Sequence, residues 1–289
     1  MKILILGADG MIGHKIAQTL INHRHDIILN SRSRSAFLKK TFPNAQVIGF
    51  DLSLIKIKEL LSNLNPELII NAVGITIRRG AQFDQTTNYI NSILPHEIDL
   101  WCQENKKKLI HFSTDCVFSG KTGNYSDNDL PDAEDSYGKS KGLGEVSSSN
   151  TLTIRTSMIG RELFNKTELL EWVISNKNKK VSGFDMAIYS GVTTLWMSKT
   201  VFNIINQFPN LNGIWNISSK PISKLNLVKK INHHFKLNID INKDSSFCSN
   251  KSLNSSRFFS ETKYEIPNWD DMLSELFIDS NENANLYTK

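Results

Sequence analysis

The chain has 289 residues with 39% hydrophobic content, enough for one large domain with a smaller one appended, and its net charge of +5 is too modest and dispersed to indicate a nucleic-acid partner. Its three scattered cysteines, Cys102, Cys116 and Cys248, are too few for a disulfide framework or a zinc site. No apolar run has the length of a signal peptide or a membrane span, so we expect a soluble, cytoplasmic protein with no membrane partner.

The first residues have the pattern of a dinucleotide-binding unit. The apolar run Lys2–Leu6 predicts a strand, the glycine loop 7–13 follows at once, and Lys15–Ile21 has a helical pattern. In this order, backbone N–H groups at the start of the helix can hold a pyrophosphate. The residues of this unit that we expect to contact the dinucleotide are Gly7, Asp9, Gly10, Met11, Ile12 and Gly13.

The end of the second predicted strand, Asp26–Leu29, indicates which dinucleotide binds. An NAD-preferring site places an aspartate or glutamate there, against the ribose hydroxyls. This chain instead has two serines and two arginines after Asn30. Ser31, Arg32 and Arg34 suit a 2′-phosphate, which favours NADPH over NADH, while the other interpretation is a solvated polar loop.

The next residues continue the alternation of strand and helix. Val47–Asp51 and Pro66–Gly74 are predicted strands, and Leu54–Leu64 is a predicted helix between them. This alternation predicts a Rossmann-type α/β fold, a doubly wound parallel sheet with helices on both faces. Ligands gather at the carboxyl edge of such a sheet. There we place further cofactor contacts: Asp51, which is expected to reach the adenine amino group, and Leu52, Asn71, Ala72, Val73 and Gly74.

The loop Ile75–Asp84 follows this edge. Its Thr76 is a candidate substrate contact, and Arg78-Arg79 is either a phosphate contact or a charged surface loop. A long helix is expected over Asn88–Glu104, with Pro95 as an irregularity within it.

The candidate catalytic residues come after the fifth predicted strand, Lys108–Phe112. Ser113 and Thr114 lie at its carboxyl end, on the cofactor edge. Farther on, Tyr137 and Lys141 are four residues apart and therefore share one face of a helix, so the ammonium can sit beside the phenol. A phenol placed in this way can hold its proton ready for transfer.

With these residues in place, the chain resembles an extended short-chain dehydrogenase/reductase, most of all the branch that contains dTDP-4-dehydrorhamnose reductase. The resemblance runs from Met1 to about Arg155 and is weaker afterwards. Several spaced motifs in one order carry it: Gly7-x-x-Gly10-x-x-Gly13, Asp51, Asn71-Ala72, Tyr89-Ile-Asn91, Ser113-Thr114-Asp115-x-Val117-Phe118-x-Gly120 and Tyr137-Gly-Lys-Ser-Lys141.

The resemblance implies a role for each catalytic residue. Tyr137 would donate the proton, Lys141 would lower the pKa of that phenol and bind the nicotinamide ribose, and Thr114 would hydrogen-bond the substrate carbonyl. The implied reaction is NADPH-dependent reduction of the 4-keto group of a nucleoside-diphosphate 4-keto-6-deoxy sugar, in deoxysugar and surface polysaccharide biosynthesis. The nucleotide base, the sugar and the product stereochemistry stay open, and a homodimer is an expected assembly.

Three departures from the family pattern limit this interpretation. Asp115 is followed by Cys116 where dehydratases of the family have a glutamate, which argues against dehydration. A cysteine there keeps a sugar-nucleotide epimerase or epimerase-reductase open, although the histidine partner of such enzymes has no counterpart over 161–172. Lys15 stands where some relatives bind magnesium through an acidic residue, so we expect no metal. A non-catalytic NADP-binding regulatory subunit of the same fold is the remaining alternative.

The second half of the chain is expected to build the substrate pocket. Its predicted elements are helices over Leu163–Ser175, Thr194–Phe208 and Leu225–Phe235 and a strand over Gly213–Ile217. We expect a cofactor domain over 1–158 to which 192–219 return, a substrate-binding region over 159–191 and 220–279, and a flexible tail over 280–289. The candidate substrate contacts are Thr76, Asp115, Cys116, Arg161, Trp172, Lys251 and Arg257.

Overall fold

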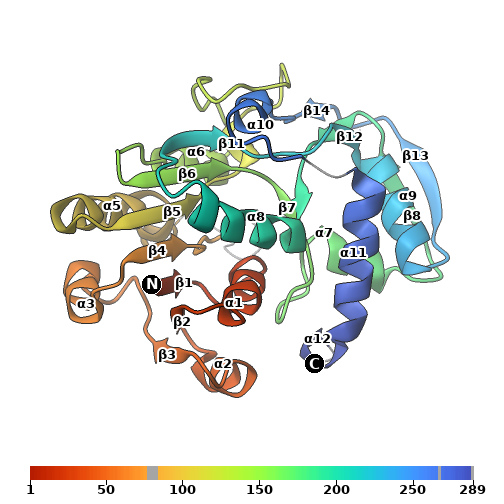
Figure 1. Ribbon diagram of the computed structural model, residues 1–289. Helices are drawn as coiled ribbons and strands as arrows, with labels where there is room; N and C mark the ends of the chain where they lie inside the picture. The colour runs from red at the N-terminus through yellow and green to blue at the C-terminus, as the bar shows by residue number, and fades with distance from the viewer. Residues whose placement is uncertain (77–83, 266–267, 288–289) are drawn as a thin grey trace.

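The computed structural model describes residues 1–76, 84–265 and 268–287. A seven-stranded sheet in the order β11-β6-β5-β4-β1-β2-β3 forms its centre, with every neighbouring pair parallel (Figure 1). This is the predicted Rossmann-type fold. The strands are β1 (Lys2–Leu6), β2 (Asp26–Ser31), β3 (Gln46–Gly49), β4 (Leu68–Asn71), β5 (Lys108–Phe112), β6 (Thr151–Arg155) and β11 (Gly213–Asn216).

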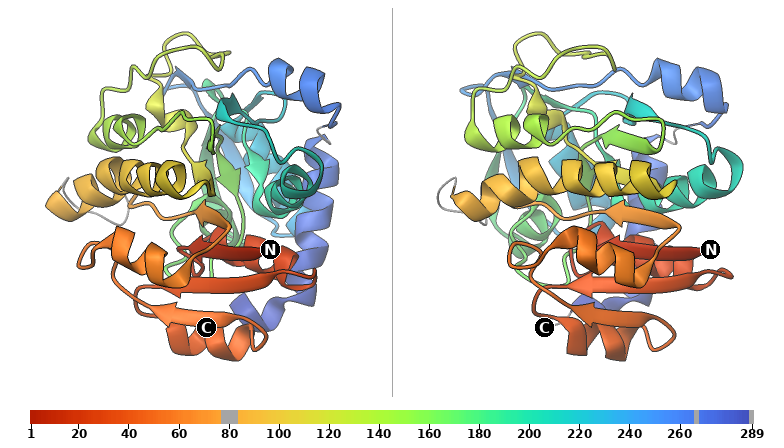
Figure 2. Two further views of the ribbon diagram at one scale, coloured as in Figure 1. Left: turned by 60° about the vertical axis from the view of Figure 1, so that its left-hand side comes forward. Right: turned by 90° about the vertical axis from the view of Figure 1, so that its left-hand side faces the viewer.

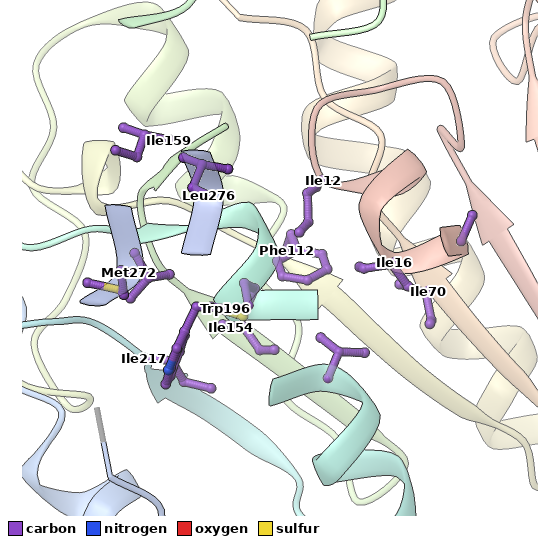
Figure 3. Packing of buried hydrophobic residues seen from close by; sticks show 14 of the residues in the cluster. Ile12, Ile16, Ile70, Phe112, Ile154, Ile159, Trp196, Ile217, Met272 and Leu276 are labelled. Carbon is purple, nitrogen blue, oxygen red and sulfur yellow. The ribbon is translucent and has the colours of Figure 1, made fainter. Parts of the chain in front are cut away.

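Helices cover both faces of this sheet because its central strands are apolar on both sides. Ile3 and Ile5 of β1 belong to one buried cluster, and Leu4 and Leu6 belong to another, as alternation along a strand requires. The first cluster includes side chains of α1 (Gly13–Ile21) and α8 (Thr194–Gln207), and the second includes those of α3 (Ile57–Leu64) and α5 (Leu94–Asn105). Figure 3 shows part of the first cluster, from Ile16 and Ile70 to Met272 and Leu276.

Smaller sheets and helices follow β6 and form a second lobe at one side of the sheet (Figure 1). The strands of this lobe pair as β7 (Met158–Ile159) with β10 (Val192–Thr193), β8 (Lys180–Phe184) with β13 (Asp240–Asp244), and β9 (Ala187–Tyr189) with β12 (Ile222–Ser223) and β14 (Ser249–Asn250). The remaining helices are α2 (Ser35–Thr41), α4 (Gln85–Asn88), α6 (Ser136–Leu143), α7 (Leu169–Ser175), α9 (Lys224–Phe235), α10 (Ser256–Thr262), α11 (Trp269–Glu282) and α12 (Ala284–Tyr287). None of the helices within the described ranges is both long and apolar enough to cross a membrane.

The long helix expected over Asn88–Glu104 is irregular shortly before Pro95 and not at Pro95 itself. A π-helical turn, Tyr89–Ile93, separates α4 from α5, and Pro95 lies in the first turn of α5. The N–H of Leu94 still donates to the carbonyl oxygen of Tyr89, and Pro95, which has no N–H, follows directly after this irregular turn.

The helix expected over Leu163–Ser175 begins only at Leu169, so the prediction was wrong for its first residues. Asn165 and Lys166 have φ of +62° and +53°, which interrupts helical backbone. The carboxylate of Glu162 accepts hydrogen bonds from the backbone N–H groups of the two residues that precede α7, at 2.6 and 2.7 Å. Tertiary contacts therefore overrode the helical pattern.

The flexible tail expected over 280–289 also needs correction, because the chain is helical as far as Tyr287. Helix α11 runs from the second lobe along the sheet toward α1, and Figure 2 shows this course. Lys15 pairs with Asp279 at 2.7 Å, and both side chains are largely buried. The Tyr287 ring is 3% exposed and its hydroxyl lies 3.1 Å from Nε2 of His14. These contacts tie the end of the described chain to the helix that follows the glycine loop.

Candidate active site

A cavity of about 510 Å³ opens at the carboxyl edge of the sheet. Its walls come from the glycine loop, from the residues that follow β2, β3 and β4, and from the turn before α7. The predicted cofactor residues that line it are Gly7, Asp9, Gly10, Met11, Arg32, Arg34, Asp51, Leu52, Ala72, Val73 and Gly74. The other predicted cofactor residues, which are not part of this lining, are Ile12, Gly13, Ser31, Asn71, Tyr137 and Lys141.

The glycine loop is built for close approach of a ligand to the backbone. Gly7 has φ of +74°, and a Cβ atom at Gly13 would collide with the carbonyl group of Gly7. Helix α1 begins at Gly13 with no acidic residue in its first turn, so its N-terminal N–H groups keep their positive potential. These features fit a pyrophosphate at this end of the cavity.

The residues after β2 and β3 form the far end of the cavity. The Oγ atom of Ser31 accepts a hydrogen bond from the backbone N–H of Arg34 at 2.9 Å, which shapes the loop. Hydrogen bonds from Ser53 hold the pKa of Asp51 below its usual value, and the nearby Arg32 acts in the same direction. Asp51 is therefore a carboxylate acceptor, as its predicted contact with an adenine amino group requires.

Asn71 acts behind the cavity wall. Its Oδ1 accepts from the N–H of Val73 at 3.2 Å, and its Nδ2 donates to Nδ1 of His111 at 3.1 Å. Burial lowers the pKa of His111 well below its usual value, so the ring is a neutral acceptor at this contact. The pair joins the ends of β4 and β5 under the candidate catalytic residues.

The structure brings Thr114 and Tyr137 together. Thr114 precedes a short 3₁₀ turn, Asp115–Val117, where its Oγ1 accepts from the N–H of Cys116 at 3.1 Å and donates to Oδ1 of Asp115 at 3.2 Å. Its hydroxyl lies near enough to the phenol of Tyr137 to influence the pKa of that phenol. Burial is the largest cause of a raised pKa at Tyr137, and Cys116 and Asp115 add to it. This direction is opposite to the lowering that the resemblance implies. The phenol therefore holds its proton at neutral pH.

Lys141 lies one helical turn farther along α6 and is 4% exposed. Its Nζ donates to the carbonyl oxygen of Phe112, at the end of β5, at 2.8 Å. Burial lowers the pKa of Lys141 to about 8, and the nearby Glu145 partly opposes this. The side chain is therefore still mainly an ammonium group at neutral pH, close to the point where it loses its charge.

Comparison with known proteins identifies the family of the chain. The family model described as RmlD substrate binding domain matches residues 1–180. The chain belongs to this family. The resemblance to the dTDP-4-dehydrorhamnose reductase branch is confirmed at that level.

Two curated proteins are similar to this chain in sequence, and one solved structure is similar to it in fold. A probable low-salt glycan biosynthesis reductase, Agl14 of Haloferax volcanii, is 28% identical over 61% of this chain and 60% of its own length. A dTDP-4-dehydrorhamnose reductase of Burkholderia thailandensis is 28% identical over 55% of this chain and 50% of its own. The matches thus span less than two thirds of these relatives. The crystal structure of dTDP-4-dehydrorhamnose reductase from Bacillus anthracis in complex with NADP has a TM-score of 0.77 at 20% identity, covering 96% of this chain and 99% of that one, which shows a shared fold.

Two further sets of hydrogen-bonded side chains hold the elements around the site of this RmlD-family chain together. Neither was predicted from the sequence to have a role. Asn91, in the π-helical turn, bonds both backbone groups of Ile75 at 2.9 and 3.0 Å and donates to Ser140 at 3.1 Å. It therefore joins the loop after β4 to α6. The only sequence signal for it was the Tyr89-Ile-Asn91 motif of the resemblance, since its partners are distant along the chain.

The second group is a buried ion pair beneath Thr114. Glu145 accepts from Nε and Nη2 of Arg155, both at 2.8 Å, and from the Ser113 hydroxyl at 2.7 Å. The two charged side chains are 3% and 4% exposed. The resemblance included Arg155 in a motif at its weaker end, but nothing in the sequence indicated that it pairs with Glu145.

Three of the predicted substrate contacts lie near one another close to Tyr137, namely Asp115, Cys116 and Lys251. Asp115 is 4% exposed, and burial raises its pKa although Lys224 and Lys251 lie near enough to oppose this. Burial and Asp115 raise the pKa of the Cys116 thiol to about 12. Lys224, which was not predicted, lies 3.9 Å from the centre of the Tyr189 ring.

The other predicted substrate contacts are used differently. Arg161 pairs with Glu171 at 2.7 Å and stacks on Tyr287, and Arg257 lies 3.6 Å from the centre of the Trp215 ring. Trp172 is 38% exposed on α7. The hydroxyl of Thr76 is buried and has no hydrogen-bond partner within the described part of the chain, and Arg78-Arg79 lies outside that part. These contacts give Arg161 and Arg257 packing roles.

Proposed function

We propose that this protein is an NADPH-dependent reductase of the 4-keto group of a nucleoside-diphosphate 4-keto-6-deoxy sugar, acting in glycan biosynthesis. The observation that carries the proposal is the placement of Thr114 close to the buried phenol of Tyr137, with the buried ammonium of Lys141 one turn farther along α6 at the end of β5. The names of the related glycan biosynthesis reductase and dTDP-4-dehydrorhamnose reductase support the same substrate class. A cytoplasmic location and a homodimer remain predictions.

The residues of the site fit the chemistry of this reduction. When bound, NADPH supplies the hydride that adds to the carbonyl carbon. Thr114 and Tyr137 hydrogen-bond the carbonyl oxygen, and Tyr137 gives it a proton as the carbon–oxygen double bond becomes a single bond. The ammonium of Lys141 stabilises the phenolate that remains and binds the hydroxyls of the nicotinamide ribose.

NADPH is the preferred cofactor in this proposal. The loop after β2 presents Arg32 and Arg34 to the cavity and has no acidic residue among Ser31–Arg34. A 2′-phosphate suits such a loop, whereas a carboxylate would favour the bare ribose of NADH. The NADP complex of the Bacillus anthracis relative supports this choice.

The chemistry at Cys116 disfavours epimerisation. Abstraction of a proton next to the ketone needs a thiolate, and a thiol whose pKa is raised to about 12 stays protonated at neutral pH. The regulatory-subunit alternative leaves the retained Thr114, Tyr137 and Lys141 without a use. No contact in the described part of the chain favours the epimerase-reductase or the regulatory subunit over the reductase.

A panel of dTDP-, UDP- and GDP-4-keto-6-deoxy sugars tests the proposal. With NADPH carrying deuterium at the transferred position of C4, we expect one member to be reduced and to carry deuterium only at sugar C4, by mass spectrometry and NMR. In D₂O, the expected product has no deuterium at carbon-bound positions C3 or C5. Solvent deuterium at those positions would instead favour the epimerase-reductase, and a completely inactive panel would favour the regulatory subunit.

We expect the pKa of Lys141 to determine how kcat/KM for NADPH changes with pH. Because its charged form is the active one, kcat/KM for NADPH, which reports ionisations of the free enzyme, is expected to fall about tenfold per pH unit above about 8. Lys141→Arg, which stays charged, should have a lower rate without this decline. A wild-type profile that is flat to pH 10 would contradict the role of Lys141.

A further inference from the structure

The turn between β7 and α7 reaches across the chain to the predicted 2′-phosphate loop. Glu162, Leu163, Phe164 and Asn165 line the same cavity as the residues that follow β2. The turn itself is well anchored. Glu162 and Leu163 are each 2% exposed, and the carboxylate of Glu162 bonds the backbone ahead of α7.

This turn brings the Phe164 ring against the loop after β2. The guanidinium carbon of Arg34 lies 4.5 Å from the centre of that ring. On another side, Phe164 meets the ring of Phe37 edge to face, with centroids 5.0 Å apart. Phe164 thus contacts both Phe37, in the first turn of α2, and Arg34, which directly precedes α2.

These contacts hold Arg34 at two points. Ser31 fixes its backbone through the 2.9 Å hydrogen bond, and the Phe164 ring attracts its side chain through the ring quadrupole. An exposed arginine otherwise loses rotamer entropy when it binds a ligand. A cation–π contact uses the charge of the guanidinium and not its N–H groups, so these donors are kept for a phosphate.

We propose that Phe164 is a specificity-determining residue that positions Arg34 for the 2′-phosphate of NADPH. The preference for NADPH over NADH then depends on a side chain that lies far from the cofactor motif in sequence. This inference rests on the proposed use of NADPH and adds a residue outside the family motif.

The test measures binding of two probes by titration calorimetry. Adenosine 2′,5′-bisphosphate and 5′-AMP differ only in the 2′-phosphate, and neither requires turnover. Phe164→Ala is expected to weaken the bisphosphate roughly three- to tenfold while changing 5′-AMP less than twofold, in line with the strength of an exposed cation–π contact and the ordering it supplies. Phe164→Tyr, which keeps an aromatic face, should restore the wild-type ratio.

A double-mutant cycle separates positioning from simple packing. In an Arg34→Ala background, Phe164→Ala should no longer affect the bisphosphate. If Phe164→Ala weakens both probes equally, or acts equally with and without Arg34, Phe164 is only a wall of the cavity and the inference fails. A wild-type protein without preference for the bisphosphate would overturn both the NADPH assignment and this inference. An inactive sugar panel with the expected probe ratios would overturn only the proposed reaction.

Discussion

Replacing Tyr137 with phenylalanine is expected to lower kcat about 10²- to 10⁴-fold, while the dissociation constant for NADPH changes less than about threefold. The change removes only the hydroxyl group. The hydroxyl lies near Thr114. It is protonated at neutral pH because burial, Cys116 and Asp115 raise the pKa of Tyr137. Without it, the oxygen that becomes negative as hydride arrives has Thr114 as its one proposed hydrogen-bond donor.

Single-turnover oxidation of NADPH, followed by absorbance, measures this step separately from cofactor binding. Tyr264→Phe is a matched control, since its hydroxyl accepts from Asn203 at 3.3 Å in the α8 region, away from the cavity lining. The control should keep wild-type turnover. Turnover of Tyr137→Phe within tenfold of wild type would remove Tyr137 as the proton donor.

Glu145→Gln is expected to lower the free energy of unfolding by about 3 to 5 kcal/mol, because it leaves the charge of Arg155 buried without its counter-ion. The substitution conserves shape, so the loss comes from charge rather than from a cavity. The pair joins β6 to the second residue after α6, and Glu145 also accepts from Ser113 next to Thr114. A decrease in kcat should therefore accompany the loss of stability.

Urea denaturation followed by circular dichroism measures the change. Glu134→Gln is the control: Glu134 pairs with Lys121, but these side chains are 74% and 70% exposed. We expect this control to cost less than about 1 kcal/mol. Adding Arg155→Met to Glu145→Gln should recover part of the loss, since it removes the uncompensated charge. Equal, small effects at both glutamates would show that the buried pair is not important for stability.

The elements that sequence patterns predicted well are those whose cause is local. The run Lys108–Phe112 forms β5 with the predicted limits, because a short run that is mostly apolar is enough to indicate a buried strand. The glycine loop and the four-residue spacing of Tyr137 and Lys141 likewise depend on neighbours along the chain. They determined the fold class, the cofactor edge and the candidate catalytic residues.

Only the tertiary structure determined those features that depend on contacts between residues far apart in the sequence. The pattern of Leu163–Ser175 is helical, yet α7 begins only at Leu169. The carboxylate of Glu162 bonds the backbone ahead of α7, and the residues before α7, including Phe164, line the cavity instead. Arg161 became part of the packing of Tyr287, at the other end of the chain. Burial and charge pairing act between surfaces that only the folded chain brings together, so no local pattern could assign these roles.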